Sequence, residues 1–568
     1  MGMQPRNIMS SPQFFHSKAE TMLAEIATVE SASNKNCADP SPVAFLNNSA
    51  CFPHPVGEIR IIETHISWVV LTGEYAYKIK KPVNLGFLDF STLDLRQHYC
   101  NEELRLNRRF APSTYLEVVT LRGTAARPAI GGDGPILDYA VKMREFPQED
   151  LTDHLLTRGE LPPERVVEIA LNTARSHLTA PVADGDMRHG DTQSVLDPAL
   201  QNFDQLIQLP CEHNDESRLR ALRLWTEREF DRLRESFARR KLERHIRECH
   251  GDLHLGNIVL LDHRMIAFDC IEFNEHLRWI DVMNEAAFPI MDFADHDRPD
   301  LGNLFLNSYL EETGDYEGIV VLRFYLVYRA MVRAKIHRIR AQQAQATAER
   351  ARLESKFRGY LDLAIGFSRS GRPAIVIMHG LSGSGKTSIA QQLSQSFGAI
   401  RIRSDVERKR LIGLGAVART GSAVGVGLYG EDVTRAVYHR ITRLALDISE
   451  AGFPAIIDAT FLQRWQRDDI RRVCDGLHLP FAIVSVKAQE QTLRRRVARR
   501  FAGKSDASEA DMQVLEYQLT MQEPLSDEEL SLAVTAHNEC PSGAGRAQVA
   551  RALASLLGFA DLPLGGCG

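Results

Sequence analysis

Hydrophobic and polar positions divide the chain into a strand-rich start, a helical middle and a second part in which strands and helices alternate. From residue 59, IRIIETHISWVVL, then Gly73, then YAYKIKK alternate with period two, which predicts a β-hairpin. A helix is expected near 92–110 and a strand pair that ends near 139–146. From residue 150 the pattern is mainly helical up to CHGDLHLGNIVLLDHRMIAFD, where short strands flank a loop.

The second part begins with AIVIM, an uninterrupted apolar run that suits a parallel strand buried on both faces. Strand and helix patterns then alternate to residue 560, as in a doubly wound sheet. The segment before it is helix-prone, basic and free of glycine and proline. The predicted organisation is a mobile extension at 1–40, a first domain at 41–345, a helical connector at 346–370, a second domain at 371–560 and a loose tail at 561–568.

Composition narrows the class of protein. The 568 residues are 44% hydrophobic and 25% charged, which excludes collagen-like, wholly disordered and disulfide-scaffold proteins. A net charge of -6 offers no basic footprint, so nucleic acid is not an expected partner. The nine cysteines contain no C-x-x-C pair and fit reduced thiols. Without an apolar signal region or an eighteen-residue apolar stretch, we expect a soluble cytoplasmic protein with no membrane partner.

A phosphate-binding motif follows the AIVIM strand. GLSGSGKT matches G-x-x-x-x-G-K-[ST] and precedes the helical segment SIAQQLSQSF, a context that disfavours a plain glycine-rich turn. Backbone N–H groups of such a loop surround phosphate oxygens, Lys386 reaches the outer phosphates and Thr387 ligates magnesium. The predicted nucleotide-binding residues are Gly380, Ser382, Gly383, Ser384, Gly385, Lys386, Thr387 and Ser388.

Three features further along the chain fit the same chemistry. Asp405, after the strand GAIRI, is predicted to orient or deprotonate an acceptor hydroxyl, and Asp458, which ends FPAIID, to hold magnesium; helix capping is the alternative for both. Arg496 and Arg500 share a helix face and are predicted to close over transferring phosphates, with a solvated basic face as the alternative. Residues 371–530 thus resemble small-molecule P-loop kinases, such as gluconate, zeta-toxin-like and polynucleotide kinases.

A second phosphotransfer motif lies in the first domain. HGDLHLGN matches H-G-D-x-x-x-x-N, and Asp269 follows twelve residues after Asn257. Phosphoryl transfer needs a carboxylate that accepts or orients the hydroxyl proton, predicted for Asp252, and oxygen ligands for magnesium, predicted for Asn257 and Asp269. The motif resembles the catalytic segment of the aminoglycoside phosphotransferase and choline kinase branch of the protein-kinase-like fold.

That resemblance implies an upstream lysine on a strand and a glutamate on the next helix. YAYK offers Lys78 and NEELRL offers Glu103, but Lys80 and Glu102 compete for these positions, and surface charges are the alternative. Residues 143–146 are the expected hinge against adenine. The glycine-rich phosphate loop of protein kinases is missing, as it is in the aminoglycoside branch.

Neighbouring residues of this motif suggest two further roles. Cys249, His250 and His254 could form a zinc site, which the loop sequence and the lack of a fourth ligand disfavour. We expect His250 to hold the loop by hydrogen bonds instead. Asp281 matches an acidic position that braces the same fold.

From 41 to 560 the chain resembles bacterial fusions of an aminoglycoside phosphotransferase-like part with a P-loop ATP-binding part of the AAA family, on segments such as ETHISWVVLTGEYAYKIKK, LGFLDFSTL and EELRLNRRFAP. The resemblance implies an α+β protein-kinase-like fold followed by an α/β doubly wound P-loop kinase domain. The leading hypothesis is an ATP- and Mg2+-dependent phosphotransferase that acts on a small hydroxyl-bearing molecule. The alternatives are an ATP-dependent regulatory switch and a zeta-toxin-like sugar-nucleotide kinase. No motif identifies the acceptor or the oligomeric state.

Overall fold

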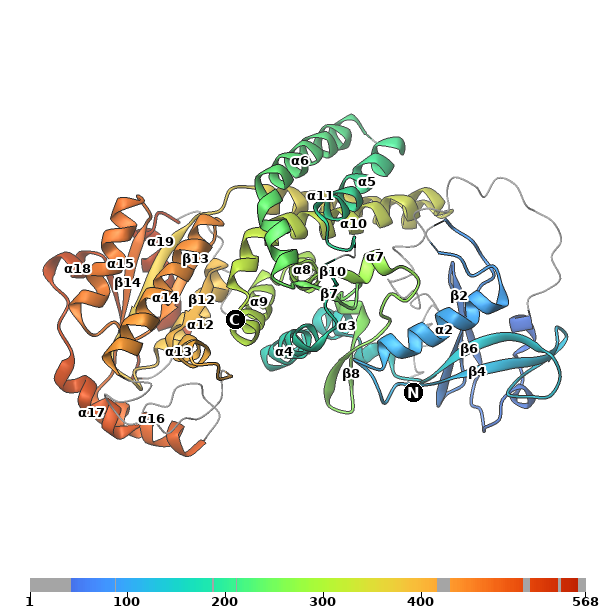
Figure 1. Cartoon of the computed structure of the whole chain (residues 1–568), viewed down its shortest axis with the longest axis horizontal. Helices are drawn as coiled ribbons and strands as arrows, with labels where there is room; N and C mark the ends of the chain where they lie inside the picture. Colours follow the sequence, from blue (N-terminus) through green and yellow to red (C-terminus); the bar gives the residue numbers. More distant parts are fainter. Residues whose placement is uncertain are drawn as a thin grey trace, which may run out of the picture. The chain divides into compact units, whose positions relative to one another are not determined.

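The computed structural model describes residues 42–86, 88–185, 188–210, 212–415, 430–503, 511–539 and 543–559 (Figure 1). The predicted extension at 1–40 and the predicted tail at 561–568 lie outside these residues. The chain forms two compact units, each built from separate stretches. Unit 1 takes its described residues from Met1–Leu155, His250–Arg278 and Val332–Phe357, and unit 2 from Leu156–Cys249, Trp279–Met331 and Arg358–Gly568.

Unit 1 is built on a six-stranded antiparallel sheet with the strand order β1-β2-β3-β6-β4-β5. The alternation in β3 buries Tyr77 and Ile79 in an apolar cluster on one face, so Lys78 and Lys80 lie on the opposite face. Helix α2 packs on β6 and β4 and begins after the N-cap residue Thr92. The bounds are β1 Arg60–Glu63, β2 Ser67–Leu71, β3 Tyr75–Lys80, α2 Leu93–Asn107, β4 Tyr115–Thr124, β5 Arg127–Ile130 and β6 Ile136–Arg144.

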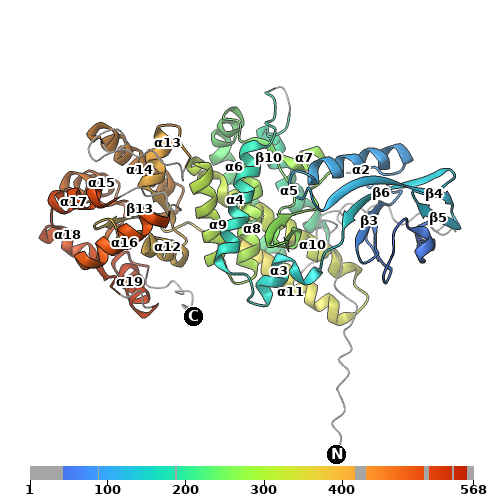
Figure 2. The ribbon, with the colours of Figure 1, turned by 90° about the horizontal axis from the view of Figure 1, so that it is seen from below.

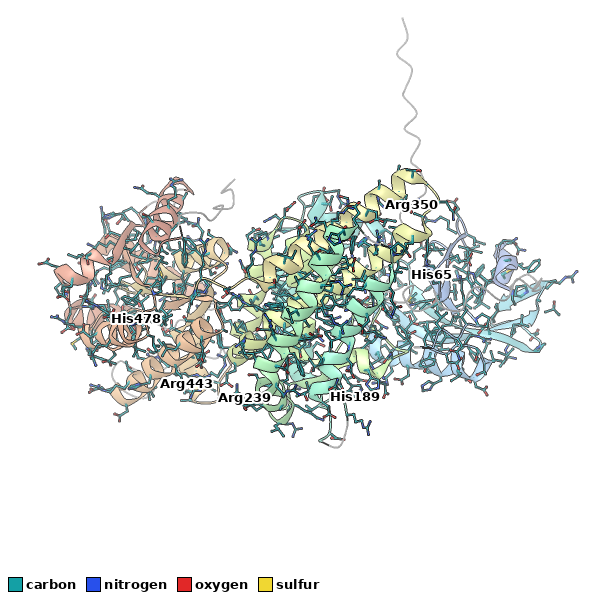
Figure 3. The ribbon with its side chains drawn as sticks, turned by 90° about the horizontal axis from the view of Figure 1, so that it is seen from above. His65, His189, Arg239, Arg350, Arg443 and His478 are labelled. Carbon is teal, nitrogen blue, oxygen red and sulfur yellow. The ribbon has the colours of Figure 1, made fainter. Side chains whose placement is uncertain are left out.

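The turn between β1 and β2 is short, since β1 ends at Glu63 and β2 begins at Ser67. The Thr64 N–H donates to the Ser67 carbonyl at 2.9 Å, and His65, labelled in Figure 3, is exposed at the turn. The H-G-D motif belongs to unit 1 and directly precedes the hairpin of β8 and β9 in the chain. The smaller elements of this unit are η1 Pro42–Phe45, η2 Ser49–Cys51, η3 Gln148–Asp150, α3 Thr152–Thr157, η4 Leu255–Asn257, β8 Ile258–Leu261, β9 Arg264–Ala267 and α7 Glu275–Arg278.

The first part of unit 2 is helical, and α9 packs against α4 and α8 (Figure 2). Arg240 donates to both carboxylate oxygens of Asp281, at 2.7 and 2.8 Å, and also binds Asp315. All three side chains are buried, so Asp281 sits in a bracing network. The bounds are α4 Pro163–Thr179, α5 Thr192–Gln208, α6 His213–Leu242, β7 Ile246–Glu248, β10 Trp279–Asp281, α8 Val282–Asp295, α9 Pro299–Thr313 and η5 Tyr316–Gly318. Two further helices, α10 Ile319–Gln343 and α11 Thr347–Ser368, have residues in both units.

The rest of unit 2 is a five-stranded parallel sheet with the order β12-β13-β11-β14-β15. All six residues of β11 are buried, because α12 and α19 cover one face of the sheet and α14 packs against β11, β12 and β13. The bounds are β11 Ala374–His379, α12 Lys386–Phe397, β12 Ile400–Arg403, α13 Ser404–Leu411, α14 Glu431–Glu450, β13 Pro454–Asp458, α15 Arg464–Gly476, β14 Phe481–Lys487, α16 Glu490–Gly503, α17 Met512–Met521, α18 Asp527–Ser531, β15 Ala533–His537 and α19 Gly543–Leu556.

These elements confirm the predicted fold class. The antiparallel sheet with α2, the loop and hairpin after the H-G-D motif and the helices of the middle segment are the parts of a protein-kinase-like fold. The parallel sheet with helices on both faces is a doubly wound P-loop domain. In the described part of the chain, every helix is too short or too polar to pass through a lipid bilayer.

Candidate functional site

The loop between β11 and α12 depends on glycine at two positions. Gly380 and Gly385 have φ angles of 137° and 93°, which side chains rarely tolerate. A Cβ on Gly385 would lie 2.0 Å from Nδ2 of Asn538, and one on Gly380 would lie 2.4 Å from the carbonyl oxygen of Val486. Both positions therefore require glycine, and the loop ends at the positive N-terminus of α12, where a phosphate is favoured.

Lys386 occupies the first turn of α12 and is buried. Its Nζ donates to the carbonyl of Leu381 at 2.8 Å. Burial lowers the pKa of Lys386 to about 8. The charges of Asp458 and Asp405 raise this pKa, and the charge of Arg500 lowers it. The fold thus brings together four of the predicted site residues, Lys386, Asp405, Asp458 and Arg500.

The serines of the loop differ in their surroundings. The Ser382 N–H donates to Oε1 of Gln518 at 2.8 Å, and the Ser384 carbonyl accepts from Asn538 at 2.8 Å. The Ser384 hydroxyl is buried and has no hydrogen-bond partner among the described residues. Ser388, which was also predicted to bind nucleotide, is exposed on α12.

Asp458 ends β13, close enough to Thr387 that the threonine hydroxyl lowers the pKa of the carboxyl group. Its Oδ2 is buried and lacks a hydrogen-bond partner in the part of the chain that the structure describes. Burial raises the pKa of Asp458, while Arg401, Arg403 and Lys386 lower it. A buried carboxylate oxygen without a donor fits a divalent cation, so these residues suit the predicted magnesium ion.

Arg496 of α16 contacts the loop directly. Its guanidinium donates to the carbonyls of Gly383 at 3.3 Å, Ser384 at 3.4 Å and Asn538 at 2.8 Å. Arg494 of the same helix instead pairs with exposed glutamates. Arg496 therefore lies at the loop rather than on a solvated basic face.

Asp405 is the second residue of α13 and is half-buried. The Ser404 hydroxyl donates to the carbonyl of Asp458 at 3.3 Å, so this serine links α13 to the end of β13. Arg403, the residue before α13, makes no side-chain cap. The carboxylate of Asp405 thus follows the C-terminal end of β12, at the crevice where open α/β sheets bind ligands.

The kinase-like site contains a buried cluster of two lysines and three carboxylates. Lys78 Nζ lies 2.7 Å from Asp269 and 3.0 Å from Glu103. Lys80 Nζ lies 2.8 Å from Glu103 and also pairs with Glu272. Burial would lower the pKa of Lys80, but the charges of Glu103 and Glu272 outweigh it and raise that pKa. Both lysines therefore stay charged and share one glutamate.

This cluster decides between the two glutamates of α2. Glu102 pairs with Arg105 at 2.8 Å, and Arg105 is about half exposed, whereas Glu103 is fully buried against the lysines. The two lysines are not exclusive alternatives, because both bind Glu103. Only Lys78 also contacts Asp269, the predicted magnesium ligand.

The loop of the H-G-D motif is held by its own side chains. Asn257 Nδ2 donates to the carbonyl oxygen and to Oδ2 of Asp252, at 3.0 and 3.1 Å, and His254 Nε2 lies 3.4 Å from the same Oδ2. His250 Nε2 lies 2.8 Å from the carbonyl oxygen of Phe268, as its expected bracing role requires. Asn257 Oδ1 is buried with no hydrogen-bond partner among the described residues, which fits a magnesium ligand.

Asp269 has a left-handed backbone. Its φ is 63°, a conformation that costs energy for a residue other than glycine and that concentrates at functional sites. The Asp269 N–H donates to the hydroxyl of Tyr115 at 3.1 Å. The predicted hinge brings Phe146 edge-on to Phe268, with ring centroids 5.0 Å apart. The aromatic pair therefore borders the residue that carries the carboxylate.

The zinc alternative is not supported. Among the described residues, the cluster that brings three such donor atoms within 4.8 Å of one another is His177, Cys249 and Glu285, without His250 or His254. In this cluster the two ring nitrogens of His177 already lie 2.9 Å from the Tyr309 hydroxyl and 3.0 Å from Glu285. Hydrogen bonding accounts for the group.

Three charged residues at these sites were not predicted from the sequence. Glu272 follows Asp269 by three residues, and this closeness to a predicted magnesium ligand could have marked it as a candidate. Arg401 and Arg403 alternate with isoleucine in IRIR, which places both side chains on one face of β12. That alternation could have identified a charged strand face next to the P-loop.

The P-loop domain matches a known family model. Residues 375–525 match the AAA_33 model, described as an AAA domain. Among solved structures, the chain is similar to a gluconokinase from Sinorhizobium meliloti 1021, with 22% identity, 34% of this chain and 94% of that chain covered, and a TM-score of 0.24. It is also similar to a choline/ethanolamine kinase family protein from Mesorhizobium loti, with 11% identity, 57% and 97% covered, and a TM-score of 0.33.

Relatives of nearly full length occur in mycobacteria. Uncharacterized proteins of Mycobacterium bovis and of two strains of Mycobacterium tuberculosis are each 31% identical to the chain over 473 residues. The match covers 81% of this chain and 91% of each relative, and so includes both motif-bearing parts. The chain therefore belongs to the same protein family as these mycobacterial proteins.

Proposed function

We propose that the protein is an ATP- and Mg2+-dependent phosphotransferase with two kinase-type sites that acts on a small hydroxyl-bearing molecule. One observation carries the proposal. Each site contains a buried lysine and a buried oxygen that has no hydrogen-bond partner among the described residues, Asn257 Oδ1 in one and Asp458 Oδ2 in the other. Burial of such an oxygen is costly unless a cation or a hydrogen-bond donor binds it, and a magnesium ion next to nucleotide phosphates would meet this need.

At the kinase-like site, Lys78 neutralises nucleotide phosphates while Glu103 holds the lysine. Asp252 accepts the proton of the acceptor hydroxyl as the hydroxyl oxygen bonds to the γ-phosphorus and the bond from that phosphorus to the ADP oxygen breaks. Asn257 orients Asp252 through its amide. Asn257 and Asp269 would hold the magnesium ion, which supplies charge neutralisation of the phosphates when bound.

At the P-loop site, the loop amides and Lys386 bind the outer phosphates. Asp405 orients the acceptor hydroxyl, and Arg496 and Arg500 offset the charge that develops during transfer. Thr387 and Asp458 would hold the second magnesium ion. The proposal of a small-molecule acceptor is in keeping with the gluconokinase and the choline/ethanolamine kinase family protein named above.

The test is ADP release by the full-length protein with pooled hydroxyl metabolites and with aminoglycosides, with and without Mg2+. Asp252→Asn and Lys386→Ala are assayed singly and together, since each removes a central group from one site. We expect acceptor-stimulated release that one or both substitutions abolish. Nucleotide binding without any acceptor-stimulated turnover would reject the phosphotransferase and favour a regulatory switch.

A further inference from the structure

Helix α9 presents three polar side chains along one face, Asn303, Asn307 and Glu311, which we call the α9 seam. Their spacing of four residues places them on the same side of the helix. The α9 seam contacts α12 and β12 of the P-loop domain, and all of these elements belong to unit 2 (Figures 1 and 2). The helix itself comes from the kinase-like half of the sequence.

Asn307 pairs with the backbone of β12, the edge strand of the parallel sheet. Its Oδ1 accepts from the Arg401 N–H at 2.6 Å, and its Nδ2 donates to the Ala399 carbonyl at 3.0 Å. One amide thus supplies the bonds that a neighbouring strand would make. Asn303 adds a bond to the Gln395 carbonyl at 3.3 Å. These contacts fix α9 along the edge of the sheet.

Glu311 binds two arginines of this strand with one carboxylate. Its Oε2 lies 2.9 Å from Arg401 Nη2, and its Oε1 lies 2.6 Å from Arg403 Nη1. The arginine side chains are 9% and 14% exposed, so little water screens the three charges. The Glu311 carbonyl also accepts from Arg410 at 2.7 Å. Glu311 therefore helps to orient both guanidinium groups, while Arg401 also donates to the Thr387 carbonyl at 3.5 Å.

The two arginines stand next to the predicted magnesium ligand. In the pairing of β12 with β13, Arg403 is in register with Asp458, and Arg401 is in register with Ile456 on the same face. Loss of the Glu311 charge would remove one carboxylate partner from each guanidinium, which would favour pairing of these groups with the Asp458 carboxylate. That pairing would occupy the oxygen that a cation needs.

We propose that Glu311 is a positioning residue of the P-loop site, which holds Arg401 and Arg403 so that Asp458 stays available to Mg2+. The inference rests on the function proposed for that site. It makes the kinase-like half a structural part of the second nucleotide site, because the carboxylate comes from α9.

The experiment measures how ATP binding by the full-length protein depends on Mg2+ concentration. The P-loop component is defined as the binding that Lys386→Ala removes. Glu311→Gln, which keeps the shape and removes the charge, should require about tenfold more Mg2+, the usual scale for groups that orient metal ligands. The matched control is Glu312→Gln, since Glu312 pairs at 3.3 Å with Arg175, whose side chain is 61% exposed. This variant should have the Mg2+ requirement of the wild type.

A second variant separates positioning from helix docking. In Glu311→Gln alone, both guanidinium groups lose their Glu311 partner. The added substitution Arg403→Gln removes one of these groups, so the Mg2+ requirement of the double variant should return toward the wild-type value. A docking role alone predicts that the double variant is worse than the single one, and this result would overturn the inference. So would a wild-type Mg2+ requirement in Glu311→Gln. Wild-type protein without any Lys386-dependent binding would reject the proposed function itself, and the inference with it.

Discussion

Replacing Lys80 by Met tests the charged cluster of the kinase-like site. Lys80 is fully buried, 2.8 Å from Glu103 and paired with Glu272. Methionine is of similar length but carries no charge. Glu272 would then lose its Lys80 partner, and of the two lysines at Glu103 Lys78 alone would remain. Removal of one partner from a buried ion pair costs about 3–5 kcal/mol. We expect a loss of this size in the stability of β3.

The next residue is a matched control. Lys81 pairs with Glu63 at 2.7 Å, but the Glu63 side chain is 68% exposed, so Lys81→Met should cost less than about 1 kcal/mol. The assay is native-state hydrogen exchange of β2 and β3 in the full-length protein. At about 1.4 kcal/mol per factor of ten, Lys80→Met should speed exchange at least about a hundredfold, and Lys81→Met less than about tenfold.

The loss should depend on pH. Burial raises the pKa of Glu272, and a carboxyl with a raised pKa in the folded protein loses its stabilising contribution as pH rises through that value. Removal of the Lys80 charge strengthens this effect, so the defect of Lys80→Met should be largest at neutral pH and smaller near about pH 5. Equal defects in the two variants, or a defect of Lys80→Met that does not shrink in acid, would show that an uncompensated buried carboxylate is not its cause.

At the P-loop, Gly385→Ala should abolish the component of MgATP binding that Lys386→Ala removes, because the new Cβ would lie 2.0 Å from an amide nitrogen; Gly366→Ala, with open space in α11, should leave that component intact in calorimetry. Arg496→Gln should weaken the same component about tenfold, since the guanidinium bonds two loop carbonyls, while Arg494→Gln on the exposed side of α16 should not. At the kinase-like site, Asn257→Leu should remove one nucleotide-dependent Mn2+ per chain, counted by electron paramagnetic resonance; an unchanged count would exclude Asn257 as a ligand. Equal effects within either glycine or arginine pair would contradict its prediction.

The fold class and the order of the motifs could be read from the sequence because each depends on local patterns. A period of two predicts β3, and an apolar run before the glycine-rich loop predicts β11 and the start of α12. The register of Lys78 and Lys80 could not be decided, since the same period places both side chains on one face. In the structure both lysines bind Glu103, so the two positions are not exclusive alternatives.

The α9 seam could not be predicted in the same way. Asn303, Asn307 and Glu311 have the spacing of an ordinary solvated helix face, and their partners lie about ninety residues later in the chain. Only the packing of α9 against β12 shows that these side chains are used. Burial of Arg401 and Arg403 likewise depends on a helix that no local pattern places there.

If both sites bind nucleotide, one chain should bind two ATP molecules. Equilibrium dialysis of the full-length protein at saturating Mg2+ counts the ATP molecules bound per chain. We expect two for the wild type, one each for Asp269→Ala and Lys386→Ala, and none for the double variant. A single bound ATP in the wild type, or two that survive both substitutions, would exclude the two proposed sites.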